Sequence, residues 1–164
     1  MPGVYYAPTD ERNQNFANSG NANLGRWPLG HMIIIPDGRE YCFALNDGTA
    51  EVAGNLYQSV APVGDHSNVA CDLVRAIDAV VISATLGATL AAIDIYAEGD
   101  VSTTDAVGEG YSYHIRNANA AGAAHAAVAA SGVITVNLDA GEQVQVALTT
   151  ASEVSFTRNR FHQV

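Results

Sequence analysis

The chain has 164 residues, and 48% of them are hydrophobic, which is enough for one globular domain whose core needs no disulfide or metal. It carries 17 acidic residues against seven basic ones, all of which are Arg, so the net charge is −10. This balance argues against a nucleic-acid partner and against an anionic membrane, because both require clustered cations.

The first 30 residues form a polar segment that is rich in Asn and Gly and has no helical or strand period. The segment has neither the basic region nor the apolar region of a secretory signal, and no apolar run of the chain is long enough for a transmembrane helix. Single large side chains are spaced along it, a pattern typical of an arm that lies on a partner surface. We therefore predict an extended arm over residues 1–30 with the anchors Tyr5, Tyr6, Phe16, Trp27 and Leu29.

From residue 31 to residue 164 the pattern is that of a β-rich domain. Residues 31–45 hold two apolar runs around Asp37-Gly38, which predicts a hairpin; a two-residue type I′ turn there would place Gly38 at positive φ. Residues 50–60 are compatible with a short helix or with a loop. Further strands are predicted from apolar or alternating runs at 68–74, 79–87, 91–97, 110–116, 133–138, 142–150 and 153–161.

Short strands at intervals of about ten residues predict an all-β fold, a single small β-sandwich or barrel-like domain. The Ala-rich stretch at 117–132 is interpreted as a loop, because Gly122 interrupts it and it lacks the large apolar residues that stabilise a helix. The sequence shows no internal repeat.

Motifs that would carry chemistry are missing from the sequence. Gly108-Glu109-Gly110 precedes a predicted strand instead of a helix, and the chain has no Lys, so these glycines indicate a turn and not a phosphate-binding loop. The five histidines have no zinc-site spacing, and Cys42 and Cys71 are predicted to be buried free thiols.

Acidic residues gather in one part of the chain, but their spacing does not fit a calcium-binding loop, and we interpret them as a solvated rim. They are Asp94, Glu98, Asp100, Asp105 and Glu109. The sequence therefore predicts no catalytic residue, no cofactor and no metal site, and the protein is not expected to be an enzyme.

Three stretches resemble small virion structural proteins of tailed bacteriophages, in particular capsid decoration proteins, also called cement proteins. They are GHMIIIPDGREYCFAL at 30–45, the segment from YAEGDV to GEGYSYHIRNAN at 96–119, and SEVSFTRNRFHQV at 152–164. The resemblance extends loosely over residues 24–164 and does not include the arm.

The resemblance implies a non-enzymatic protein that is made in the host cytoplasm and sits on the outer capsid surface of the virion. There it would bind and stabilise the shell of major capsid protein, as a self-associated trimer or as scattered monomers. Other virion components are alternatives: a head fibre or receptor- or carbohydrate-binding module, or a head–tail or tail-tube subunit. A carbohydrate-binding module would require exposed aromatic rings, and the sequence has a single Trp, Trp27, within the arm.

Overall fold

The computed structural model describes residues 5–6, 29–34, 38–44, 52, 55–56, 58–117 and 124–162. The chain divides into two compact units. The N-terminal unit consists of Met1–Val60 together with Arg160–Val164, and the second unit is Ala61–Asn159. Residues 31–60 thus group with the N-terminal segment, whereas the sequence pattern assigned them to the β-rich domain.

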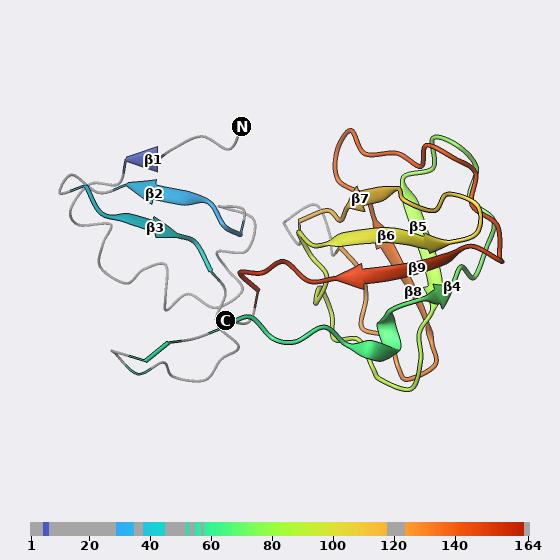
Figure 1. The fold of residues 1–164 in the computed structure, drawn as a ribbon, viewed down its shortest axis with the longest axis horizontal. Coiled ribbons are helices and arrows are strands. Elements are labelled where there is room, and N and C mark those ends of the chain that lie inside the picture. The colour runs from blue at the N-terminus through green and yellow to red at the C-terminus, as the bar shows by residue number, and fades with distance from the viewer. Residues whose placement is uncertain are drawn as a thin grey trace. The chain divides into compact units, whose positions relative to one another are not determined.

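The N-terminal unit contains a three-stranded sheet in the order β1-β2-β3 (Figure 1). Its strands are β1 (Tyr5–Tyr6), β2 (Met32–Ile34) and β3 (Glu40–Cys42). Strand β1 runs parallel to β2, and β3 runs antiparallel to it with Ile33 opposite Tyr41. The predicted hairpin is therefore confirmed.

The hairpin connection is longer than a two-residue turn. Ile34 pairs with Glu40, so the five residues 35–39 connect the strands. Gly38 has a φ of +86°, as predicted, although the turn around it is not the two-residue type.

Replacing Gly38 with Val is expected to lower the free energy of unfolding by about 1 kcal/mol or more. No atom lies within 4 Å of the position that a Cβ would take at Gly38, so the loss comes from the strained positive φ alone. Urea denaturation checks this, with Gly64→Val as the control, because Gly64 is equally open and does not have a positive φ. A Gly38→Val protein that unfolds like the parent would contradict the assignment.

The second unit is built from six strands and one short 3-10 helix, η2 (Gly64–His66). The strands are β4 (Val69–Ala70), β5 (Val81–Thr85), β6 (Asp100–Asp105), β7 (Ser112–His114), β8 (Val133–Asn137) and β9 (Glu153–Thr157). They form one sheet in the order β4-β9-β6-β7 and a second sheet of β5 and β8, with antiparallel pairing throughout. The prediction of an all-β fold is confirmed.

Two isolated β-bridges, formed by residues next to the strand ends, join the four-stranded sheet to the two-stranded sheet at both of its edges. Cys71, directly after β4, pairs with Ala84 of β5, and Ile115, directly after β7, pairs with Leu138 after β8. Both bridges are antiparallel, so the strands follow one another around the closed order β4-β9-β6-β7-β8-β5. The described strands of the unit therefore form a small closed barrel, in which each strand is paired or bridged on both sides.

The core of the barrel is formed by the inward faces of its strands. In β6, Val101 and Thr103 are buried, while Ser102 and Thr104 between and after them are less buried. The alternation follows from the two-residue period of a strand. The large buried apolar side chains of the strands include Ile82, Val101, Tyr113, Ile134, Val136, Val154 and Phe156. The segments between the strands add Leu86, Ile95, Tyr96, Ile115, Leu138, Val144 and Leu148 to the core.

Two of the predicted strands, at 91–97 and 142–150, are wrong. Residues 93–98 form turns in which Asp94 and Glu98 have positive φ, and the adjacent polar run 100–105 forms β6 instead. Its Val and Thr side chains fit a pleated, half-buried surface better than their polarity suggests. Residues 142–150 form no strand beyond one bridge at Leu148.

The two cysteines differ in their surroundings. Cys71 is buried in the barrel, as predicted, and its thiol is free. Cys42 is also free but exposed, because every residue of β3 in the N-terminal unit is exposed. The prediction that both thiols are buried is therefore wrong for Cys42.

Candidate functional site

The predicted anchors of the arm are only partly within the described residues. Tyr5 and Tyr6 supply the backbone of β1, which pairs with β2. Leu29 is half-buried in the same N-terminal unit and precedes the first residue of β2, Met32, by three residues. Phe16 and Trp27 lie outside the described residues. The structure thus brings Tyr5, Tyr6 and Leu29 into one unit, and the role of all five as anchors stays a prediction.

A buried polar network is the first candidate for chemistry in the barrel. His66 and Tyr96 are at most 1% exposed. The His66 Nε2 lies 2.9 Å from the carbonyl oxygen of Thr89 and donates to it, because a carbonyl oxygen can only accept. The hydroxyl of Tyr96 forms a hydrogen bond with the other ring nitrogen, Nδ1. Both ring nitrogens of His66 are therefore engaged in hydrogen bonds.

His125 continues the network from the other side of Tyr96. Its Nδ1 donates to the carbonyl oxygen of Ala126 at 2.8 Å, and its Nε2 accepts from the backbone N–H of Tyr96 at 3.1 Å. Burial lowers the pKa of His125, although the Ala126 carbonyl and the carboxylate of Asp94 act in the opposite direction. Both imidazole nitrogens of His125 thus take part in hydrogen bonds, and protonation of Nε2 would break the hydrogen bond from the backbone N–H of Tyr96.

These contacts crosslink irregular segments of the barrel. Tyr96 stands between the two imidazoles and packs against Phe156, with ring centroids 5.3 Å apart. Burial raises the pKa of the Tyr96 phenol, and the nearby Arg158 guanidinium opposes the rise. The network fastens η2 and the turns at 93–98 onto the core, and this anchoring is its evident role. Sequence reasoning missed it, because His66 and His125 are far apart along the chain and share no motif.

The barrel is expected to lose stability as the pH falls below about 6.5, the value for a histidine in the unfolded chain. The pKa of His125 is lower in the folded state, so the unfolded chain binds the proton first, and His125 contributes its full stability only above pH 6.5. Urea denaturation at pH 7.5 and at pH 5 measures the loss, at most about 1.4 kcal/mol per pH unit from this residue. His125→Gln retains one donor and one acceptor but cannot titrate, so it should lose less stability. Equal losses in both proteins would contradict the assignment.

The predicted acidic rim is only partly solvated. Asp100, Asp105 and Glu109 are exposed, as expected. Glu98 is buried, and its carboxylate accepts from the amide of Asn117. Asp94 is half-buried, and its Oδ1 accepts from the backbone N–H groups of residues 124 and 125. These two acids therefore hold loops in place and are not part of a rim.

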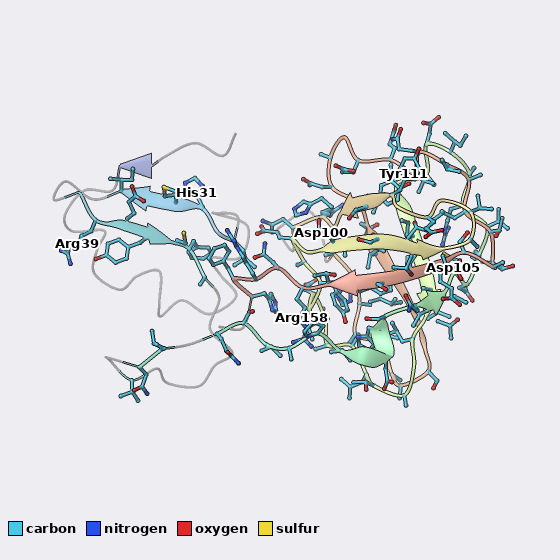
Figure 2. The ribbon with its side chains drawn as sticks, in the orientation of Figure 1. His31, Arg39, Asp100, Asp105, Tyr111 and Arg158 are labelled. Atoms are coloured by element: carbon cyan, nitrogen blue, oxygen red, sulfur yellow. The ribbon has the colours of Figure 1, made fainter. Side chains whose placement is uncertain are left out.

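The stretch at 107–117 is a turn followed by a strand, as predicted. Gly108 and Gly110 have φ values of +91° and +87°, which favour glycine. Tyr113 and Ile115 then point into the core. Tyr111, labelled in Figure 2, is 42% exposed and stacks on Tyr113 with ring centroids 6.4 Å apart.

The described surface of the barrel exposes a group of aliphatic side chains on the segment between β4 and β5. Four of them are between 53% and 65% exposed, a high value for large apolar residues on an ordered segment. They are Leu73, Val74, Ile77 and Val80. We call this group, together with the acids that flank it, the acid-flanked surface.

Backbone hydrogen bonds join this segment to the segment 139–152 at residues 144 and 148. Arg75 and Leu148 exchange two backbone bonds of 2.9 and 2.8 Å, and the N–H of Asp78 donates to the carbonyl oxygen of Val144 at 2.9 Å. The flanking acids of the two segments are Asp72, Asp78, Asp139 and Glu142. The single cation, Arg75, donates to the hydroxyl of Ser83 at 2.6 Å. The two paired segments thus carry exposed apolar side chains together with four acids and one cation, a composition that suits a partner with apolar and basic side chains.

The sequence analysis placed these aliphatic residues in or beside strands and missed their exposure. Leu73, Val74, Ile77 and Val80 are spaced i, i+1, i+4 and i+7, which is the spacing of one helix face, yet the segment forms no helix. Such a pattern does not say which side of a segment faces the core.

Within the described residues, no group of three His, Cys, Asp or Glu side chains is arranged to hold a metal ion. No helix found in that same part of the chain has the length and apolar character that crossing a membrane requires. Comparisons with protein-family models, with curated proteins and with solved structures found no match to this chain.

Proposed function

We propose that the protein is a virion structural protein, a capsid decoration or cement protein that binds the outer surface of the major capsid shell and stabilises it. The acid-flanked surface carries this proposal. Leu73, Val74, Ile77 and Val80 stay in water in the isolated chain, and burial against a partner would gain roughly 25 cal/mol for each Å² of apolar area. The resemblance of three stretches to phage decoration proteins names the class of partner.

The charge of the chain supports an exterior position. With a net charge of −10 the protein gains nothing from the packaged DNA, whereas a capsid surface with Lys and Arg around an apolar patch would complement the acids at Asp72, Asp78, Asp139 and Glu142. The arm, with Tyr5, Tyr6, Phe16, Trp27 and Leu29 as anchors, would add contacts to neighbouring capsid subunits. Aromatic anchors suit this role because they bury much area with few rotatable bonds.

Ile77→Asp is expected to weaken binding to capsids by about tenfold or more, because it replaces an exposed aliphatic side chain of the acid-flanked surface with a charge. The test is co-sedimentation with empty heads that lack the protein, over a range of protein concentrations. Thr157→Asp is the control, since it adds the same charge at an exposed position at the far end of β9. Binding should also weaken as salt rises, because opposite charges meet across the interface.

Unchanged head binding by Ile77→Asp would show that another surface is used. Binding of the parent protein to tails or fibres but not to heads would favour the alternative virion components. Absence of binding to any virion part would overturn the proposal as a whole.

A further inference from the structure

The barrel has a second apolar surface, built from two loop segments that pair with each other. The N–H of Leu86 donates to the carbonyl oxygen of Gly132 at 2.9 Å, and the N–H of Ser131 donates to that of Gly87 at 2.7 Å. Ala91 and Val128 exchange two further bonds of 2.9 and 2.8 Å. Segments 85–93 and 126–133 therefore form one continuous, backbone-bonded surface.

This surface contains no ionisable side chain. Its large exposed residues are Leu90 at 63%, Ile93 at 60% and Val133 at 42%. Small exposed side chains surround them: Thr85, Ala88, Thr89, Ala92, Ala126, Ala127, Ala129, Ala130 and Ser131. Among the described residues, two acids border it: Asp65, whose Oδ2 accepts from the hydroxyl of Thr89 at 2.6 Å, and the half-buried Asp94, which follows Ile93 and accepts from the backbone N–H groups of residues 124 and 125. We call segments 85–93 and 126–133 the charge-free surface.

We infer that the charge-free surface joins one copy of this chain to another. Each copy carries a net charge of −10, so most approaches between two copies bring like charges together and are repelled. A surface without acids is where this repulsion is weakest, and charged residues are depleted in the buried centres of protein interfaces. The alanines allow close approach and lose almost no side-chain entropy when they are buried.

The charge-free surface and the acid-flanked surface favour different partners, because they differ in charge. A basic partner would find no acidic side chain within segments 85–93 and 126–133, whereas it would find four around Leu73 to Val80. A second acidic copy is repelled by the acid-flanked surface and tolerated by the charge-free one. The two surfaces are therefore suited to different partners.

The two surfaces also lie at opposite ends of the same strand pair. Segment 72–80 leads into the start of β5, and segment 85–93 begins at its end, while β8 runs antiparallel beside it (Figure 1). Five residues of strand separate the ends by about 17 Å. Self-association through one end therefore leaves the other end open for a different partner, and the inference does not depend on what that partner is.

The test is sedimentation equilibrium of the full chain, without capsids, over a range of micromolar concentrations. The parent protein is expected to self-associate, and Ile93→Asp is expected to raise the dissociation constant by about tenfold or more. Ile77→Asp is the matched control, because it makes the same substitution at a nearly identical exposure of 57% in the acid-flanked surface. It should leave self-association unchanged. Leu90→Asp provides a second variant of the charge-free surface, and circular dichroism checks that each variant is folded.

Salt gives an independent readout. Self-association should strengthen as salt rises, because salt screens the repulsion between acidic copies. A parent protein that stays monomeric at every concentration, equal weakening by Ile77→Asp and Ile93→Asp, or self-association that weakens with salt would overturn the inference. Because no capsid is present, these outcomes are separate from those that decide the proposed capsid binding.

Discussion

Gly99→Ala is expected to destabilise the barrel by about 3 kcal/mol or more, and it will prevent folding if the backbone cannot move. A Cβ at Gly99 would lie 2.1 Å from the carbonyl oxygen of Thr157, and 3.1 Å from that of Tyr96. The oxygen of Thr157 belongs to the end of β9, so relief of the clash requires the strand itself to shift. The added methyl group has no flexible side chain to displace.

Thermal and urea unfolding of the purified variant measure this loss. Gly64→Ala is the matched control, because a Cβ at Gly64 meets no atom within 4 Å. The control should unfold within about 0.5 kcal/mol of the parent. A Gly99→Ala protein as stable as the Gly64→Ala control would mean that β9 does not end against the turn before β6.

Phe156→Ala is expected to lower the free energy of unfolding by about 3–5 kcal/mol, the range for loss of a buried aromatic side chain. Phe156 is 3% exposed on the inward face of β9, and its ring packs on Tyr96. Its removal leaves a cavity and also withdraws the support of the ring that joins His66 and His125. The loss should therefore include both packing and part of the polar network.

Thr157→Ala serves as the control, because Thr157 is the next residue along β9 and is exposed. It should change the free energy of unfolding by no more than about 0.5 kcal/mol. Similar unfolding of the two variants in urea would contradict the assignment of inward and outward faces on β9. A lower Tm for Phe156→Ala with an unchanged control would agree with it.

The local features of this fold could be predicted from the sequence. The apolar runs predicted the strands that became β2, β5 and β8, and the alternation of Val154 and Phe156 with polar residues predicted β9. Gly38, Gly108 and Gly110 were expected in turns, and all three have positive φ. These predictions were correct because the two-residue period of a strand and the conformational freedom of glycine depend only on a few neighbouring residues.

Other assignments failed where tertiary contacts outweigh local pattern. The polar run 100–105 is a strand because it lies between β7 and β9, which supply its hydrogen bonds on both sides. The apolar run 91–97 is not a strand, because positive φ at Asp94 bends the chain to bring Tyr96 and His125 together. Neither outcome can be read from the periodicity of the segment itself.

The sequence by itself determined the all-β class, the hairpin at 31–45, the turn at 107–110 and the acidic character of the protein, because each follows from composition or from neighbours in the chain. Only the tertiary structure decided the closure of the barrel, the meeting of His66 with Tyr96, and the exposure of Ile77 and Ile93. These features depend on which distant segments pair, as Cys71 does with Ala84, and pairing decides which side of an apolar segment is covered. The sequence pattern around an aliphatic residue does not show whether a neighbouring strand buries its side chain or whether the side chain stays exposed.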